Sequence, residues 1–201
     1  MRLTKNQQNA LRVARLISVI LHPLVIAPLT YALIIAHTSE INRTQKLLYL
    51  GLVLIAIIFI PLISVLYLKK RGETTSLDVP ERDKRISPFL VCIAGYFIVW
   101  ILLKVSGAPR PISLLMWCYG FNSIIATIIT KYWKISVHGM ALGGPIAALG
   151  FVISPTFYWG ILIAPLIVYS RVKLKAHTIA QVITGFLLGF LLTLIQFEIF
   201  L

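Results

Sequence analysis

The sequence predicts an all-α protein, a polytopic integral membrane bundle of six to seven transmembrane helices. Of its 201 residues, 59 % are hydrophobic and 12 % are charged, whereas soluble domains average about 45–50 % and about 25 %. The mean hydropathy is +0.92, and the apolar residues gather in runs long enough to cross a bilayer. A soluble domain of this length cannot bury so much apolar surface, so we expect lipid as the solvent and a single domain over residues 1–201.

Seven apolar runs define the expected helices, and the polar gaps between them define the loops. The runs cover residues 16–36, 47–68, 88–106, 114–130, 140–153, 157–169 and 178–201. The first run is too long for the apolar part of a signal peptide. The fifth and sixth are short and contain Pro145 and Pro165, so they either cross at an angle or form a hairpin that stops part-way.

Short sequence motifs predict where two of the helices begin and where helices pack closely. Ser87 and Pro88 are typical of an N-cap and a first helical residue, and Thr178 is expected to begin the last helix. Gly139 and Gly143, like Gly185 and Gly189, have the four-residue spacing that lets membrane helices approach closely. We expect these glycines to pack helices within the bundle rather than to form a dimer.

The basic residues are unevenly distributed between the two ends of the bundle. The chain has 19 Lys and Arg against 6 Asp and Glu. The loops 69–87, 131–139 and 170–177 each follow an even number of crossings, so they share one face with the N-terminus. That face holds every Lys and Arg except Arg43, Lys46, Lys104 and Arg110. The positive-inside rule places it in the cytoplasm, at an inner or plasma membrane. Basic residues confined to such loops favour contact with membrane lipids, not with nucleic acid.

Each of these three loops carries a polar cluster just ahead of a predicted helix. The clusters are DVPERDKRISP at 78–88, WKISVHG at 133–139 and SRVKLKAHTIAQ at 170–181. Helix N-termini with nearby cations favour bound anions, so the clusters predict a pocket for a phosphate or diphosphate. A neutral imidazole can attack phosphorus while a second one protonates the leaving oxygen. The acidic residues nearby lie in one loop only, so we expect metal-free chemistry and no cofactor.

The same residues resemble the motifs of a known family. SRVKLKAHTIAQ resembles SRxxxxxHxxxD, the third motif of the type 2 phosphatidic acid phosphatase superfamily, which includes the vanadium haloperoxidases. ISVHG resembles the second motif, PSGH, without the Pro and the Gly before the His. ERDKRISP is loosely similar to the first motif, KxxxxxxRP. The chain thus resembles a divergent member, with a family-like core over about residues 78–189.

The resemblance implies a metal-independent membrane phosphatase that hydrolyses a lipid phosphate or a polyprenyl diphosphate through a phosphohistidine. His177 would be the nucleophile and His138 the general acid. The implied phosphate-binding residues are Arg82, Lys84, Arg85, Ser136, Gly139 and Arg171. Gln181 stands where the family has the Asp that orients the nucleophile, and an amide lacks the charge that stabilises imidazolium. A catalytically weak or inactive relative, which binds a lipid phosphate without turnover, is therefore the alternative.

Other interpretations of the polar residues are also open. One alternative for the loop with Arg82, Lys84 and Arg85 is that it only contacts lipid headgroups. KVSGAPRP at 104–111 also resembles the first motif, but helix parity places it on the opposite face, so we expect an ordinary loop. His22 precedes Pro23 inside the first run, and we expect a neighbouring helix residue to satisfy it. A prenyltransferase would need a second acidic cluster, which the sequence lacks.

Overall fold

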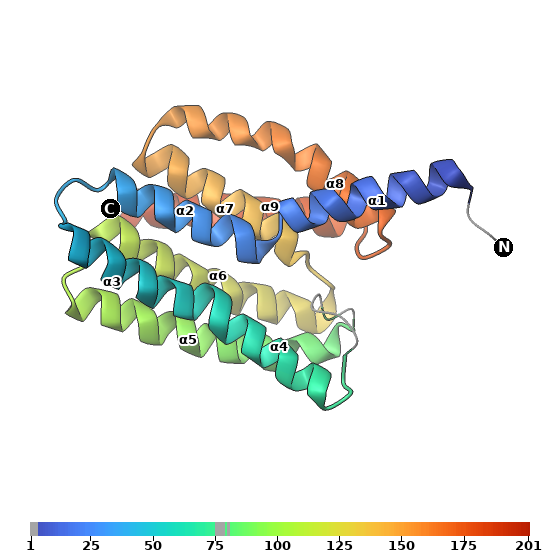
Figure 1. The fold of residues 1–201 in the computed structure, drawn as a ribbon, viewed down its shortest axis with the longest axis horizontal. Coiled ribbons are helices and arrows are strands. Elements are labelled where there is room, and N and C mark those ends of the chain that lie inside the picture. Colours follow the sequence, from blue (N-terminus) through green and yellow to red (C-terminus); the bar gives the residue numbers. More distant parts are fainter. Residues whose placement is uncertain (1–3, 75–78, 80) are drawn as a thin grey trace.

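In the computed structural model, which describes residues 4–74, 79 and 81–201, every regular element of the described chain is helical (Figure 1). The elements are α1 (Lys5–Ile20), α2 (Pro23–His37), α3 (Arg43–Leu54), the π-helical turn η1 (Ile55–Phe59), α4 (Ile60–Lys70), the 3₁₀ turn η2 (Asp83–Arg85), α5 (Ile86–Val105), α6 (Arg110–Tyr132), α7 (Val137–Val152), the 3₁₀ segment η3 (Pro155–Ile163), α8 (Ala164–Lys173) and α9 (Ile179–Phe200).

Five helical runs of the described chain are long and apolar enough to cross a membrane. They are Lys5–His37, Arg43–Lys70, Asp83–Val105, Arg110–Tyr132 and Ile179–Phe200. The apolar helix α7 is shorter. The predicted all-α membrane bundle is confirmed.

The first predicted helix is two helices, α1 and α2, separated at His22. The backbone of His22 is extended, with φ −72° and ψ 142°. Pro23 explains the break, because the residue before a proline is pushed out of the helical region and proline itself has no N–H to donate. The break turns His22 into the N-cap of α2, where its Nδ1 accepts a hydrogen bond from the N–H of Leu24 at 3.1 Å.

The second span is continuous but widens in its middle. The π-helical turn η1 joins α3 to α4, and Pro61 follows it at the start of α4. Because Pro61 cannot donate to the carbonyl four residues earlier, at Ile57, the regular ladder is interrupted there. Such π-turns frequently mark functional sites, and Ile57 and Pro61 both line the cavity described below.

Two expected elements differ from the sequence prediction. Ser87 is not an N-cap: α5 begins at Ile86, and its N-cap position is Arg85, which makes no capping hydrogen bond through its side chain. The 3₁₀ turn η2 leads directly into α5, so the chain is already helical before Ser87. The run predicted at 157–169 starts as the 3₁₀ segment η3 and becomes α-helical only at Ala164.

Helices α7 and α9 pack at close range through glycines, as predicted. A Cβ atom added to Gly139 would meet the backbone of Val182, and one added to Gly143 would meet the backbone of Phe186. From the other side, a Cβ on Gly185 would meet the backbone of Ser136. The glycine pairs thus hold α7 against α9 within the bundle and fix the start of α7 beside the start of α9.

Replacing Gly143 with alanine is expected to destabilise the protein. The added Cβ has no room against the carbonyl of Phe186, and overpacking of this kind costs about 1–3 kcal/mol. Gly51→Ala on α3 is the matched control, since nothing lies within 4 Å of its added Cβ and alanine is the better helix former. Thermal unfolding in detergent should show a lower midpoint for Gly143→Ala only. Equal midpoints for the two variants would contradict this packing.

The three polar loops meet at one end of the bundle, as helix parity predicted. Between the first two loops, an Arg82 Nη1–H donates to the carbonyl of Tyr132 at 3.1 Å. Between the last two, the Lys134 Nζ donates to the carbonyl of Ala176 at 2.9 Å. The N-terminus extends from this end, whereas the C-terminus and segment 104–111, which joins α5 to α6, lie at the other end (Figure 1). Segment 104–111 is therefore far from the polar loops.

Candidate active site

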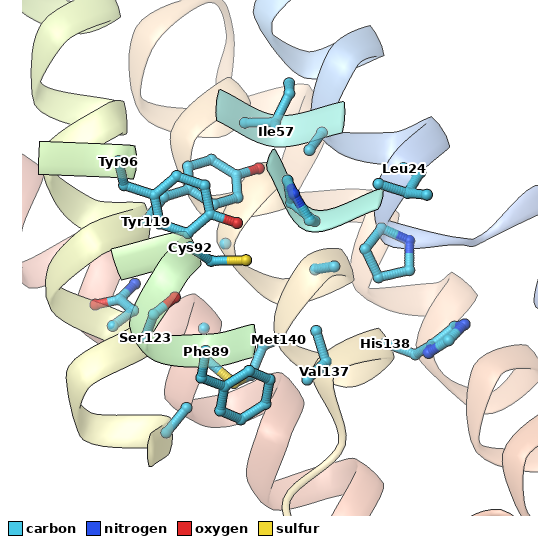
Figure 2. Close-up of a pocket in the computed structure, with 18 of the residues that line it drawn as sticks. Leu24, Ile57, Phe89, Cys92, Tyr96, Tyr119, Ser123, Val137, His138 and Met140 are labelled. Atoms are coloured by element: carbon cyan, nitrogen blue, oxygen red, sulfur yellow. The ribbon is translucent and has the colours of Figure 1, made fainter. Parts of the chain in front are cut away.

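A cavity of about 220 Å³ connects the polar end of the bundle with its interior. It lies between α2, α4, α5, α6, α7 and α9. Four predicted site residues line it, namely Arg85, His138, Arg171 and His177. They come from the start of α5, the start of α7, the end of α8 and the loop before α9, so the fold gathers residues that lie up to 92 positions apart. Figure 2 shows His138 on one side of this cavity and Tyr96 and Tyr119 on the other.

The imidazole of His177 is oriented by Gln181. Thr178 and Gln181 form a capping box at the start of α9, in which the Gln181 Oε1 accepts the N–H of Thr178 at 3.1 Å. This bond fixes which end of the amide is oxygen. The same Oε1 lies 3.1 Å from the His177 Nδ1. Because Oε1 can only accept, Nδ1 carries the proton and Nε2 keeps its lone pair.

Burial and positive charge keep His177 neutral. His177 is 8 % exposed. Burial, followed by the charges of Arg85, Lys134 and Arg171, lowers the pKa of His177 from 6.5 to about 3, and the hydrogen bond with Gln181 opposes this shift only in part. At neutral pH the ring is therefore an uncharged base among cations, which suits a nucleophile that must attack a bound anion.

Acid is expected to destabilise the fold through His177. The unfolded chain binds more protons than the folded chain between pH 6.5 and about 3, because the pKa of His177 is lower in the folded chain. The free energy of unfolding therefore keeps its full value above pH 6.5 with respect to His177, and it decreases as the pH falls through that window. For one group the loss is about 2 kcal/mol at pH 5. Unfolding midpoints at pH 7 and pH 5 should differ more for the native protein than for His177→Gln. The same acid sensitivity in both proteins would contradict the assignment.

Ser18 of α1 connects Arg171 with His138, and the sequence prediction missed it. Arg171 is 1 % exposed, and its Nη1 donates to the Ser18 Oγ at 2.7 Å. The same Oγ lies 3.5 Å from the His138 Nε2. A hydroxyl that accepts from the guanidinium keeps a second lone pair and its own proton, so Ser18 can pair with His138 in either protonation state. A lone serine inside an apolar run was the only sequence signal for this role.

His22 is hydrogen-bonded within its own helix, as expected, and it also lies at the site. Its Nδ1 caps α2, so a neighbouring helix residue does satisfy it, as predicted. Its ring also meets the His138 ring edge-on, with ring centroids 4.9 Å apart, and it lines the cavity. The break before Pro23 is what brings this ring beside His138.

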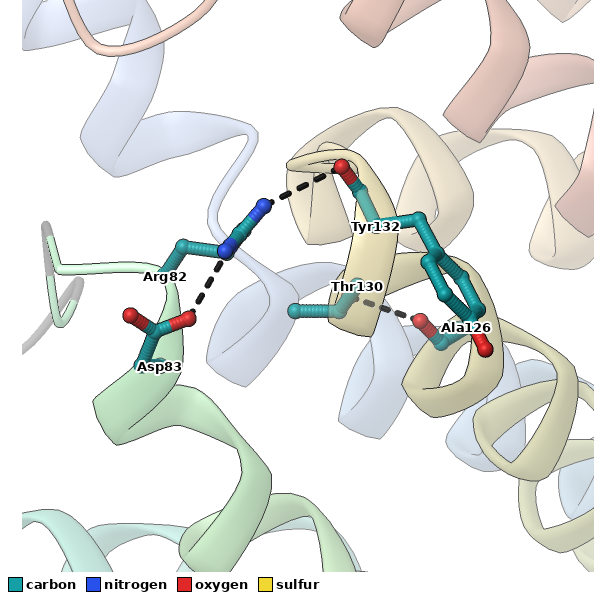
Figure 3. A network of polar contacts seen from close by, with 5 residues as sticks. All are labelled: Arg82, Asp83, Ala126, Thr130 and Tyr132. Atoms are coloured by element: carbon teal, nitrogen blue, oxygen red, sulfur yellow. Dashed lines mark hydrogen bonds and ion pairs between the residues drawn. The ribbon is translucent and has the colours of Figure 1, made fainter.

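The predicted arginine cluster divides between the cavity and the surface. Arg85 is 5 % exposed and donates to the carbonyls of Val79 at 2.7 Å and Ile135 at 3.3 Å. Arg82 does not line the cavity: it donates to Asp83 at 3.0 Å and to Tyr132 on the outer surface (Figure 3). Lys84 is exposed and donates to the carbonyl of Glu73. Of the three, Arg85 alone is placed to hold a ligand inside.

Ser136 and Gly139 form a helix cap instead of part of the cavity wall. The N–H of Gly139 donates to the Ser136 Oγ at 3.3 Å, which closes the first turn of α7. Ser136 is fully buried, and neither residue is among those that line the cavity. The predicted donation from Gly139 to a phosphate oxygen is replaced by this cap, which positions His138 at the second residue of α7.

Metal ligands do not gather here, since no group of three or more His, Cys, Asp or Glu residues suited to a metal ion occurs in the described part of the chain. The cavity is lined by three imidazoles, those of His22, His138 and His177, by two guanidiniums and by a mostly apolar interior. Comparisons with protein-family models, with curated proteins and with solved structures give no match to this chain. Function is therefore inferred from the chemistry of the site.

Proposed function

We propose that the chain is a metal-independent phosphatase of a lipid phosphate or diphosphate. One observation carries the proposal: His138, His177, Arg85 and Arg171 line the same cavity, and this cavity continues into the apolar interior of the bundle. A phosphate suits the charged end, because guanidinium groups form strong hydrogen bonds with its oxygens. An apolar tail suits the remainder. The resemblance to the type 2 phosphatidic acid phosphatase superfamily points to the same reaction.

In the first step, the His177 Nε2 attacks phosphorus. A P–N bond forms while the bond between phosphorus and the leaving oxygen breaks, and His138 donates a proton to that oxygen. Arg85 and Arg171 balance the negative charge on the remaining phosphate oxygens. Gln181 holds the Nδ1 proton of His177 throughout, so the attacking nitrogen stays aligned.

In the second step, water attacks the phosphohistidine. His138, now deprotonated, accepts a proton from that water, the new P–O bond forms, and the P–N bond to His177 breaks. Inorganic phosphate leaves, and both histidines return to their starting states. We place this chemistry on the cytoplasmic face, because that end holds all Lys and Arg residues except Arg43, Lys46, Lys104 and Arg110.

The proposal is tested by phosphate release from purified protein in the presence of EDTA. Lipid phosphates and polyprenyl diphosphates are screened together, and the native protein should release phosphate from at least one. His177→Ala should abolish release. His37→Ala is the matched control, since His37 is exposed at the opposite end of α2, and it should keep the native rate. Release by His177→Ala at the native rate would overturn the mechanism.

Gln181 favours the alternative of a catalytically weak or inactive relative. A single substitution decides between this alternative and a fully active phosphatase. Gln181→Asp keeps an acceptor for the Nδ1–H and adds a charge that stabilises the imidazolium. We expect turnover to rise at least about tenfold, which corresponds to about 1.4 kcal/mol of transition-state stabilisation. The rate of phosphate release measures it. An unchanged or lower rate would show that the amide already serves the native chemistry fully.

A further inference from the structure

We propose that the inner part of the cavity binds one hydrocarbon chain of roughly ten carbons, so that the ligand is a single-chain lipid phosphate or diphosphate, not a two-chain phospholipid. This inference rests on the proposed function for the charged end, and it concerns the remainder of the cavity. Most of the wall there is apolar: Leu24 and Ala27 of α2, Ile57 of η1, Phe89 of α5, and Met140 and Ala141 of α7. Polar side chains in the lining include those of Ser64, Asn122, Ser123 and Thr193. Such a surface binds hydrocarbon.

Two antiparallel helices give the length of the chamber independently. The lining residues of α5 run from Arg85 at the charged end to Tyr96, a distance of 11 residues along the helix, or about 16 Å. The lining residues of α6 run from Ala126 to Leu115, again about 16 Å. An extended chain gains roughly 1.2 Å per bond, so this length holds roughly a dozen chain atoms.

The volume of the cavity agrees with one chain and excludes two. An apolar cavity of about 150 Å³ accommodates one benzene, with its six carbons. On the same scale, the 220 Å³ of the whole cavity, charged end included, holds at most roughly nine carbons. Two chains of equal length would need about twice that space. A two-chain phospholipid would have to leave one chain outside the bundle.

The inner end of the chamber is closed by buried side chains. Leu115 is 1 % exposed and Ile57 is 3 % exposed. Tyr119 stands between Tyr96 and Tyr31, with ring centroids 5.8 Å and 5.9 Å away, and Tyr31 is fully buried behind it. A chain that reaches this wall has no further space, so the chamber sets an upper limit on chain length.

The test is a chain-length series measured on a protein that binds without turnover. Purified His177→Ala is mixed with n-alkyl phosphates from butyl to hexadecyl and with a dialkylglycerol phosphate, and thermal stabilisation is recorded. We expect stabilisation to rise to a maximum near ten carbons and to fall beyond it, with the two-chain ligand weaker than decyl phosphate. Stabilisation that is independent of chain length, or greatest for the two-chain ligand, would overturn the proposal.

Two substitutions should move the maximum in opposite directions. Ala27 lies five residues from His22 along α2, about 7 Å into the chamber, so Ala27→Leu should shift the maximum to chains of roughly half the length. Tyr119→Ala opens the inner wall and should shift it to longer chains; the Tyr119 hydroxyl has no hydrogen-bond partner in the described chain, so this change breaks none there. Ala36→Leu, at an exposed position of α2, is the control. An unmoved maximum in both chamber variants would contradict the assignment.

The chain-site proposal and the phosphatase proposal can fail independently of each other. If the native protein releases no phosphate while His177→Ala shows the expected maximum, the chain site stands and the catalytic proposal fails. If the native protein hydrolyses alkyl phosphates of every length at one rate and Ala27→Leu changes nothing, the phosphatase stands and the chain site fails.

Discussion

Replacing His138 with alanine is expected to leave a protein that transfers one phosphoryl group to His177 and then stops. In the proposed reaction His138 has two tasks, donating a proton to the leaving oxygen and accepting one from the attacking water. A substrate whose leaving group departs readily as an anion makes the first task unnecessary but not the second. The phosphohistidine should then form and accumulate, because general-base catalysis of its hydrolysis, worth about 10²–10⁴-fold, is absent.

The experiment uses p-nitrophenyl phosphate, which releases a coloured anion. His138→Ala should give a burst of one nitrophenolate per protein molecule, followed by a steady rate about 10²–10⁴-fold below the native one. An alkaline quench preserves the phosphohistidine, and peptide mapping should locate it at His177. The double variant His138→Ala/His177→Ala should give no burst. A native steady rate in His138→Ala, or a phosphorylated residue other than His177, would contradict the assigned roles.

The fold was predictable because it follows from composition and spacing. Apolar runs separated by basic loops predict which segments are long enough to cross a membrane and which ends meet, and glycines four apart predict close helix packing within the bundle, which the structure shows between α7 and α9. The irregular features were not predictable from hydropathy. The break at His22 and the π-turn before Pro61 each depend on a proline inside a run that is uniformly apolar, and hydropathy does not distinguish a bend from a straight helix.

The candidate site was predictable in its outline and not in its details. Arg171 and His177 carried a recognisable spacing, and both line the cavity. Arg82 and Arg85 lie in the same short loop, and nothing in their sequence context says which guanidinium faces inward. Ser18 escaped prediction because it belongs to the first helix, far along the chain from every motif. A hydroxyl inside an apolar span is a signal in itself, since polar groups within membranes usually have a specific partner.

Substituting Arg171 with methionine is expected to weaken ligand binding far more than the same change at Arg82. Arg171 is buried, lines the cavity and donates to Ser18, so its loss should raise the Kd for decyl phosphate about 10²–10³-fold. Methionine is apolar, unbranched and flexible, so it fills much of the space of the arginine stem without adding a polar group. The side chain of Arg82 is 40 % exposed and lies outside the cavity, so Arg82→Met should change the Kd less than about threefold.

The same pair of variants also tests the ionisation of His177, the proposed nucleophile. The charge of Arg171 helps to lower the pKa of His177, so Arg171→Met should raise that pKa toward 6.5. The fall of kcat/KM at acidic pH reports the pKa of His177 in the free enzyme. This fall, the acid limb of the pH profile, should then occur at higher pH, because a larger fraction of His177 is protonated at any given pH. Arg82→Met should leave the limb where it is. If both variants weaken binding equally and neither moves the acid limb, the anion is held by the outer loop, and the buried cavity is not the site.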